Sequence, residues 1–445
     1  MSDLVEPTET TVPGRSGLVG RVSWGILDQA VSSLGNFVLS ICAARGLPVS
    51  GFGAFSLAFV FFIFLVNASR GVATDPLMVR FSGPETPEWR RAVSAASGAA
   101  LNLGLLAALC SLAAGLVAGG PVGTSFAALA VGLPGLLLQD SYRCALFSRG
   151  QGKRVFLNDL LWSVLQVAGL GVLLSLDKVS ITALMLVFGG TATVAAGFGW
   201  WQTGLAPRPT WTRSWFATHR SLSGRYLIEN IAVGGARQVQ VFALGAVAGL
   251  AAVAQQRAAE ILMGPFLILL AGVGQVSVPE ARTVIGQDPG RLRRFCLTLG
   301  GIQAALAAGW AVAAMIVLPW GPGELLLGDL WRPAQRLLVP LTLIYVLGFF
   351  HAALTAGLRA LGASRRSLKA QLVTSTLFAS FGVVGAYLGA AWGASWAVVI
   401  GLVIGLATWW VQLGHGVRDY QAQARVTPVD RDRSESTTER SIDVT

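Results

Sequence analysis

Charged side chains are scarce in this sequence. They make up 12% of its 445 residues, where an ordinary globular protein has roughly 25%. Hydrophobic residues reach 53%, and the mean hydropathy is +0.62. Because so few charges cannot cover the surface of a soluble fold, a globular enzyme, a disordered scaffold and a secreted disulfide module are all excluded. We therefore expect most of the chain to lie in lipid.

Residues that carry catalytic and metal chemistry are also few. The four cysteines lie in or beside apolar stretches and show no metal-binding or redox spacing. None of the three histidines has an acidic partner at catalytic spacing. No glycine-rich loop ends in Lys-Ser or Lys-Thr, which argues against ATP hydrolysis by this chain. We expect a protein that is not an enzyme, with no catalytic residue, metal ion or cofactor.

Twelve apolar stretches are each long enough to cross a bilayer, which takes about 20 residues of helix. Helices are the only open-ended structure that satisfies backbone polar groups inside hydrocarbon. The sequence therefore predicts an all-α polytopic membrane protein with about twelve transmembrane helices. The stretches are 22–45, 52–75, 92–118, 123–147, 155–176, 181–203, 224–248, 251–276, 295–318, 334–358, 368–389 and 391–414.

The basic residues mark one side of the predicted membrane. When the lysines and arginines of the loops are assigned to alternate sides, 21 fall on one side and five on the other. Loops rich in Lys and Arg stay in the cytoplasm, so we expect a multi-pass protein of the plasma membrane with both termini cytoplasmic. The formal net charge of +11 then indicates contact with anionic lipids at helix ends, and no nucleic-acid partner.

The second half of the chain repeats the first at a nearly constant offset. Some matches between basic residues are expected by chance, but a steady offset indicates two six-helix bundles related by a pseudo-two-fold axis along the membrane normal. Nine extra residues in the second half fall in the loop around 319–332, whose counterpart lies near 119–123. The matches are Arg21 with Arg225, Gly46-Leu47 with Gly249-Leu250, Pro76 with Pro279 and Arg90-Arg91 with Arg293-Arg294.

These patterns divide the chain into five segments. They are a cytoplasmic segment 1–19, a first six-helix bundle 20–203, a connector 204–223, a second six-helix bundle 224–415 and a tail 416–445. Aromatic and basic residues in the connector are typical of a segment that lies on the inner membrane interface, and an irregular loop fits equally well. The tail has many charges and few large apolar residues, so we expect it to be disordered.

Ionisable residues inside the predicted spans are informative, because a central arginine or aspartate costs about 2.5–3.5 kcal/mol on insertion scales. Arg237 lies near the middle of the seventh stretch and shares a helix face with Asn230. Such residues favour a polar cavity between the bundles. The alternative is a set of interhelical ion pairs, such as Arg237 with Glu229 or Glu260. Pairs expected to be structural are Arg70 with Asp75 and Asp140 with Arg143.

Three segments of the first 160 residues carry recognisable motifs: SWGILDQAVSSLGNFVLSICAARGLPVSGFGAFSLAFVFF, SRGVATDPLMVRFSG and FSRGQGKRVFLND. In the first, AARGL is followed by FGAF. These segments resemble the Wzx-type polysaccharide flippases of the multidrug/oligosaccharidyl-lipid/polysaccharide exporter superfamily, in an actinobacterial form. The resemblance implies a V-shaped pair of bundles that carries an undecaprenyl-pyrophosphate-linked oligosaccharide to the outer leaflet by alternating access, for synthesis of cell-surface polysaccharide.

The resemblance also implies roles for the polar residues within the spans. An arginine-lined cleft suits a phosphate group, because the planar guanidinium binds it bidentately and stays charged. The substrate-binding candidates are Arg237, Asn230, Arg257 and Arg70, and the coupling candidates are Asp28, Glu229 and Glu260. Expected partners are the lipid-linked oligosaccharide, anionic lipids and glycosyltransferases or a polymerase of the same pathway. Two alternatives stay open: a cation-coupled multidrug exporter of the same superfamily, and a non-transporting membrane partner in envelope synthesis.

Overall fold

The computed structural model describes residues 15–426, so most of the expected segment 1–19 and the last part of the expected tail, 427–445, lie outside the described residues. Every regular element of the described chain is a helix. Ten of these helices are long and apolar enough to cross a membrane. The expectation of an all-helical, multi-span membrane protein is confirmed.

The first half contains six membrane-length helices in the expected order. The second of them, α2, ends in a π-helical turn, η1 (Arg70–Thr74), and continues into the short α3 (Asp75–Arg80). A π-helical turn interrupts the regular hydrogen-bond ladder and often marks a functional position. The six long helices are α1 (Arg15–Gly46), α2 (Val49–Ser69), α4 (Pro87–Ala118), α5 (Gly120–Ser148), α6 (Gly152–Ser175) and α7 (Ile181–Thr203).

Helix α8 (Thr212–Gln287) is a hairpin of two antiparallel legs. The chain reverses at Gly249, whose φ of 83° is a left-handed conformation that glycine adopts without strain. The side-chain amides of Gln240 and Gln256 bond each other across the two legs, at 3.1 and 3.3 Å. The seventh and eighth predicted spans, 224–248 and 251–276, are therefore the two legs of one hairpin.

Helix α12 (Ser364–Val426) has the same construction, with its reversal at Gly389 and Ala390. The legs are joined by a hydrogen bond of 3.0 Å from the indole nitrogen of Trp409 to the hydroxyl of Thr374. Together with α9 and α11, the four hairpin legs supply six membrane-length segments, so the ten continuous spans correspond to the twelve predicted ones. The remaining elements are η2 (Pro209–Trp211), η3 (Pro289–Arg291), α9 (Leu292–Val317), η4 (Leu318–Trp320), α10 (Pro322–Leu327), η5 (Gly328–Leu330) and α11 (Trp331–Ala360).

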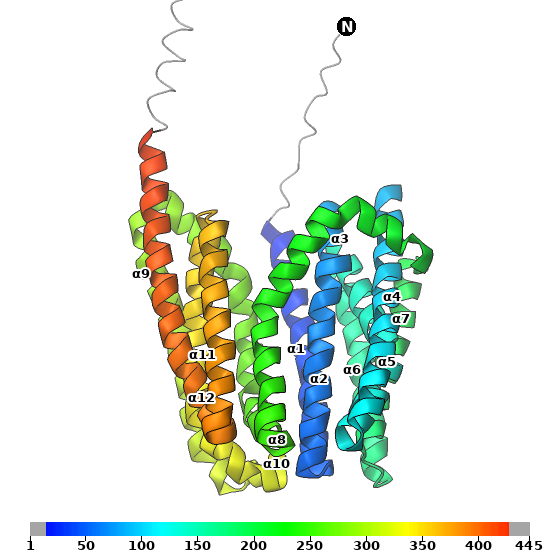
Figure 1. Cartoon of the computed structure of the whole chain (residues 1–445). Helices are drawn as coiled ribbons and strands as arrows, with labels where there is room; N and C mark the ends of the chain where they lie inside the picture. Colours follow the sequence, from blue (N-terminus) through cyan, green and yellow to red (C-terminus); the bar gives the residue numbers. More distant parts are fainter. Residues whose placement is uncertain (1–14, 427–445) are drawn as a thin grey trace, which may run out of the picture.

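The two halves stand side by side, with α8 between them (Figure 1). Both ends of the described chain lie at the same end of the molecule, which we call the terminal end. The reversals at Gly249 and Gly389 lie at the opposite end, which we call the hairpin end.

Hydrophobic packing differs between these two ends. At the hairpin end, one cluster of buried residues includes members of both halves, among them Leu39 and Phe55 from the first and Leu327 and Trp331 from the second. At the terminal end each half has its own cluster. The cluster of the first half includes Trp89, and that of the second half includes Trp409. The halves therefore share a hydrophobic cluster at the hairpin end, while toward the terminal end the first leg of α8 keeps contact with the first half, where Leu227 lies against Gly71 and Asn230 against Asp75.

The connector 204–223 packs against the first half and does not form a loose segment. Its η2 turn accepts a hydrogen bond of 2.9 Å at the carbonyl of Pro209 from Asn102 of α4. Trp215 is buried, and its indole nitrogen lies 3.4 Å from the carbonyl oxygen of Val72. These contacts anchor the start of α8 on the first half before the helix crosses to the second.

The first residues of the predicted tail are helical. The second leg of α12 continues to Val426, where the sequence suggested disorder from residue 416 onward. Val417 is buried in the terminal-end cluster of the second half. Asp419 forms an ion pair with Arg366 of the first leg, with 2.5 Å between Oδ2 of Asp419 and Nη2 of Arg366. A charged helix can extend beyond the membrane when a neighbouring leg supplies such contacts.

The positive-inside pattern makes a direct prediction of topology: the terminal end faces the cytoplasm. Ser214, at the start of α8, and Thr124, near the start of α5, are both exposed and lie toward opposite ends. Single cysteines at these positions, in a background without the native cysteines, should react with an impermeant maleimide from inside and from outside the cell, respectively. Labelling of Ser214→Cys from outside intact cells would reverse the assigned orientation.

Candidate functional site

A polar cavity of about 280 Å³ lies between the two halves. Helix α1 forms its wall on the side of the first half, and both legs of α8 together with α11 form the wall on the other side. Because the walls belong to different halves, any change in the angle between the halves changes the shape of the cavity. Its polar lining residues are Gln29, Ser33, Asn36, Ser40, Arg237, Arg257, Glu260 and Tyr345.

Glu260 lies between two arginines in the wall formed by the second half. Its Oε2 is 2.8 Å from Nη2 of Arg237 and 3.3 Å from Nη1 of Arg257. The reversal at Gly249 explains the first contact, because it places residue 237 of one leg beside residue 260 of the other. Oε1 of Glu260 accepts a hydrogen bond of 3.3 Å from Gln256. Two guanidiniums and one carboxylate give this group a net charge of +1.

The two arginines are placed differently. The side chain of Arg237 is 48% exposed, whereas those of Arg257 and Glu260 are 20% and 9% exposed. Arg257 also reaches the first half, where its Nη2 lies 3.4 Å from the hydroxyl of Ser40 and its guanidinium 5.0 Å from the ring centroid of Phe59. Arg237, which bonds Glu260 and Tyr345, therefore remains half-exposed to the cavity, while Arg257 is held by both halves.

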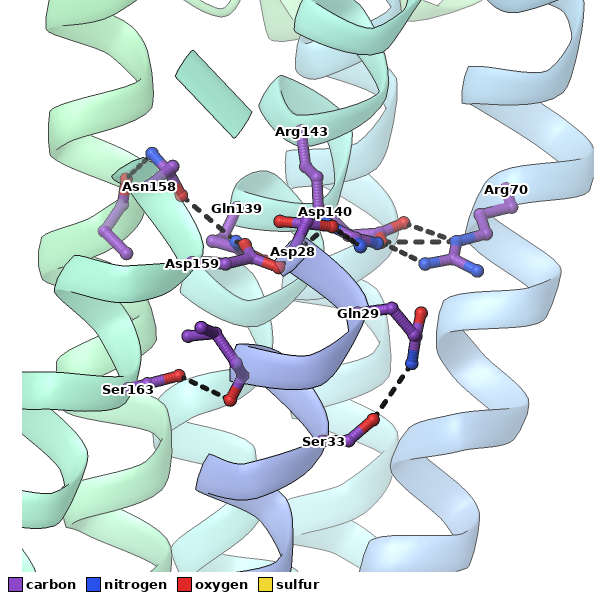
Figure 2. A network of polar contacts seen from close by, with 12 residues as sticks. Asp28, Gln29, Ser33, Arg70, Gln139, Asp140, Arg143, Asn158, Asp159 and Ser163 are labelled. Atoms are coloured by element: carbon purple, nitrogen blue, oxygen red, sulfur yellow. Dashed lines mark hydrogen bonds and ion pairs between the residues drawn. The ribbon is translucent and has the colours of Figure 1, made fainter. Parts of the chain in front are cut away.

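A second polar network lies inside the first half, where α1, α2, α5 and α6 meet (Figure 2). Arg143 of α5 pairs with Asp28 of α1, and its Nε lies 3.0 Å from Oδ2 of Asp159 on α6. Arg70 forms a bidentate pair with Asp140, at 2.6 Å from Nη2 to Oδ1 and 2.9 Å from Nε to Oδ2. Four helices are thus joined through charged side chains.

Amide side chains complete this network. Gln139 donates to Asp159 at 2.9 Å and to Asn158 at 3.1 Å, and Asn158 donates to the carbonyl of Ala195 at 2.9 Å. Three buried carboxylates face two guanidiniums, so the fully ionised network has a net charge of −1. A cavity of about 180 Å³ borders it, and Asn36 lines both this cavity and the one between the halves.

Three of the predicted site residues, Arg237, Arg257 and Glu260, come together in the cavity between the halves. Of the two ion-pair partners that the sequence offered for Arg237, the structure pairs it with Glu260. The side chain of Glu229 lies outside the described part of the structure. Asp28, predicted for coupling, lies in the network of the first half.

Two substrate-binding candidates are placed away from Arg237. Arg70 lines the cavity of the first half. Asn230 lines neither of the two cavities, because its amide nitrogen donates to Asp75 at 2.8 Å and to the backbone oxygen of Asn67 at 3.2 Å. Asp75 is therefore engaged by Asn230, and the expected pair of Asp75 with Arg70 is wrong.

The expected pair of Asp140 with Arg143 is also wrong, since Asp140 is bound by Arg70 and Arg143 by Asp28 and Asp159. Neighbours three residues apart on one helix were expected to pair, but each side chain points to a different helix. Arg143 and Asp159 were not among the site residues predicted from the sequence, whereas Asp28 was. The signal for them was the spacing of Gln139, Asp140 and Arg143 within an apolar stretch, followed by Asn158-Asp159 in the next.

Known proteins share this fold at low sequence identity. No family model matches the chain, and no curated protein matches it in sequence. A multidrug resistance MATE family transporter of the MOP superfamily, in an inward-facing conformation, matches with a TM-score of 0.71 at 14% identity, over 89% of this chain and 96% of that one. The lipid II flippase MurJ, in an inward closed conformation, matches with a TM-score of 0.67 at 10% identity, over 91% of both chains.

A neighbour in another conformation matches with a lower score. An outward-facing MATE family transporter of the MOP superfamily gives a TM-score of only 0.55 at 15% identity, over 91% of this chain and 96% of that one. The fold is therefore that of the MATE and MurJ structures.

Arg143 should be essential for the stability of the first half. Its replacement by glutamine leaves Asp28 and Asp159 buried without a cation, and breaking a buried ion pair costs about 3–5 kcal/mol. Thermal unfolding of purified Arg143→Gln in detergent should show a markedly lower Tm than the unchanged protein. Arg90→Gln, which breaks an exposed pair with Glu85, is the matched control and should cost less than about 1 kcal/mol.

If the reason is the unpaired charge, removing the carboxylates as well should restore stability. The combination of Arg143→Gln with Asp28→Asn and Asp159→Asn should therefore recover most of the lost Tm. An unchanged Tm in Arg143→Gln alone would contradict the ion-pair account.

Proposed function

We propose that this protein is a transporter that flips an undecaprenyl-pyrophosphate-linked oligosaccharide from the inner to the outer leaflet by alternating access. The observation that carries the proposal is the cavity between the halves, whose wall holds two guanidiniums and one carboxylate. A net positive, partly exposed arginine site suits a pyrophosphate, because the guanidinium fork binds phosphate oxygens bidentately. Asn36, Gln29 and Ser33 add neutral polar groups that suit sugar hydroxyls.

The two faces of α1 support a cargo attached to a lipid. Gln29 and Ser33 line the cavity, whereas Leu27 and Leu34 of the same helix are 48% and 56% exposed. A single helix thus separates a polar cavity from an apolar surface. A carrier whose head group enters the cavity beside α1 can leave its prenyl chain in the bilayer, so the chain need not cross a polar region.

The structural neighbours support the proposal that this protein is a transporter. Their printed names point to two kinds of cargo. One neighbour is a lipid II flippase, whose printed name specifies a lipid-linked substrate. Others are multidrug resistance transporters. Both descriptions are of membrane transport, which supports a transporter in place of an enzyme.

The cellular setting follows from the same proposal. The protein acts in the cell membrane with its terminal end toward the cytoplasm, where the lipid-linked oligosaccharide is loaded. Basic residues at helix ends contact anionic lipids. Glycosyltransferases or a polymerase of the same pathway are the proposed partners. The halves 20–203 and 224–415 are the two moving bodies, and the connector 204–223 joins them.

A cation-coupled multidrug exporter is the second candidate function. The excess of one carboxylate in the first-half network favours it, because such a group can hold an exchangeable cation or proton. The cavity between the halves favours an anion instead, since its ionised group carries a net charge of +1. A non-transporting partner in envelope synthesis is disfavoured by the exposure of Arg237, because a packed scaffold has no need of a guanidinium that faces a cavity in the bilayer.

Arg237 should be required for transport more than for folding. Charge-assisted hydrogen bonds contribute about 1.5–3 kcal/mol, so Arg237→Ala should lower flipping of the lipid-linked oligosaccharide in proteoliposomes by about tenfold or more. Arg237→Lys should retain part of the activity, because a point charge replaces a bidentate fork. Membrane abundance of both variants should stay near that of the unchanged protein.

The ion pair with Glu260 supplies the control for this experiment. If Arg237 serves only to neutralise Glu260, the double variant Arg237→Ala with Glu260→Gln should recover both abundance and flipping. Recovery of flipping in the double variant would therefore refute substrate contact by Arg237. Efflux of a cationic dye without flipping would establish the multidrug function instead.

Asp28 should act in coupling, since it shares one guanidinium with Asp159 and one of the two carboxylates can accept a proton. Asp28→Asn should abolish transport driven by a pH gradient while leaving gradient-independent exchange of cargo intact. Glu260→Gln and Glu229→Gln are the parallel variants for the other two coupling candidates. Gradient-driven transport that is unchanged in all three would reduce these carboxylates to structural groups.

A further inference from the structure

A polar contact joins the two halves at the hairpin end. Nη1 of Arg45, in the last turn of α1, donates to the backbone carbonyls of Glu324, at 3.2 Å, and Leu325 in α10. The carbonyl of Glu324 also accepts from the backbone N–H of Gly328 at the end of α10, and carbonyl oxygens in the last turn of a helix lie at the negative end of its dipole. A guanidinium is therefore a favourable partner for the end of α10, and here it comes from the other half of the molecule.

Each side of this contact is fixed within its own half. A side chain at Gly46, next to Arg45, would clash with Val179 in the turn before α7, so the end of α1 is packed closely against the first half. In the second half, a Cβ on Gly323 of α10 would lie 2.5 Å from the indole of Trp331, which is itself buried. The contact thus connects two anchored bodies, and α10 is not a loose loop.

Helix α10 lies within the segment that breaks the internal repeat. The connection 318–330 comprises η4, α10 and η5, whereas α4 passes to α5 in the first half through Gly119 alone. The second half therefore carries, at the hairpin end, an element without a counterpart in the first. The internal symmetry of the two bundles does not account for α10. A contact across the interface between the halves requires such an element in one half only.

We propose that Arg45 and α10 form a latch that holds the hairpin end closed and must release for the cavity to open there. The latch rests on the proposed function only in requiring alternating access, and it is independent of the cargo. The contact is exposed at the edge of the interface, where its two hydrogen bonds can break without unfolding either half. The shared hydrophobic cluster beneath it then separates as a second step.

Distances between spin labels test the latch directly in the full chain. Thr124 in the first half and Tyr387 in the second are exposed positions near the hairpin end and away from α10. Both are changed to cysteine in a background without native cysteines, labelled, and measured in lipid nanodiscs by pulsed electron spin resonance. Loss of the latch should increase the population with the longer distance by about tenfold relative to the shorter one.

The variants separate the latch from a general effect of charge. Arg45→Ala should give the full shift, and Arg45→Lys a smaller one. Gly323→Ala should give the same shift by displacing α10 from Trp331 without removing any charge. Arg336→Ala, which removes another exposed arginine from this end, is the matched control and should leave the distances unchanged.

The outcomes distinguish this proposal from the proposed function. Distances that are unchanged in both Arg45→Ala and Gly323→Ala would overturn the latch, whatever the transport assays show. A shift in these two variants, together with unchanged flipping in Arg237→Ala, would support the latch and refute the cargo assignment. An equal shift in Arg336→Ala would also overturn it, because the effect would then be one of surface charge.

Discussion

The two halves share a hydrophobic core at one end only, and the rest of the molecule depends on this. At the hairpin end the cluster runs from α1 and α2 into α8, α10 and α11 without a break, whereas the terminal-end clusters around Trp89 and Trp409 are separate. The halves are therefore closed against each other at the hairpin end. Because apolar packing gains little over lipid contact, this closure can be reversed, and polar contacts such as that of Arg45 can decide between states.

The buried ionised groups are a second constraint on the structure. Their net charge is negative in the first half and positive in the second. The network of the first half has three carboxylates for two guanidiniums, while the group around Glu260 has two guanidiniums for one carboxylate. A negative excess suits a proton and a positive excess suits an anionic cargo. Asn36 lines both cavities, so the two groups are neighbours in one polar region that crosses from the first half to the interface.

Hydropathy predicted the helical legs well, because crossing a bilayer is a local property of some 20 residues. Even the reversals fall where predicted stretches meet: Gly249 lies between 224–248 and 251–276, and Gly389 and Ala390 lie at the junction of 368–389 with 391–414. The ion-pair partners were not predictable in this way. Helical spacing places Asn230 on the same face as Arg237, but seven residues are about 10 Å along the axis. Asn230 therefore meets α2 and Asp75, while Arg237 meets the second leg of α8. Which helix is the neighbour is decided by the tertiary arrangement.

Arg257 connects the cavity to the closed end of the molecule. It shares Glu260 with Arg237 on its own side, and it contacts Ser40 and Phe59 on the other. Phe59 belongs to the hydrophobic cluster that joins the halves. In the proposed alternating-access cycle, opening of the hairpin end would move α1 and α2 away from α8, so Arg257 would lose these two contacts while keeping Glu260. The donors facing the cavity would then differ between the two states of the proposed cycle, and such a change would lower the affinity for a cargo on the side of release.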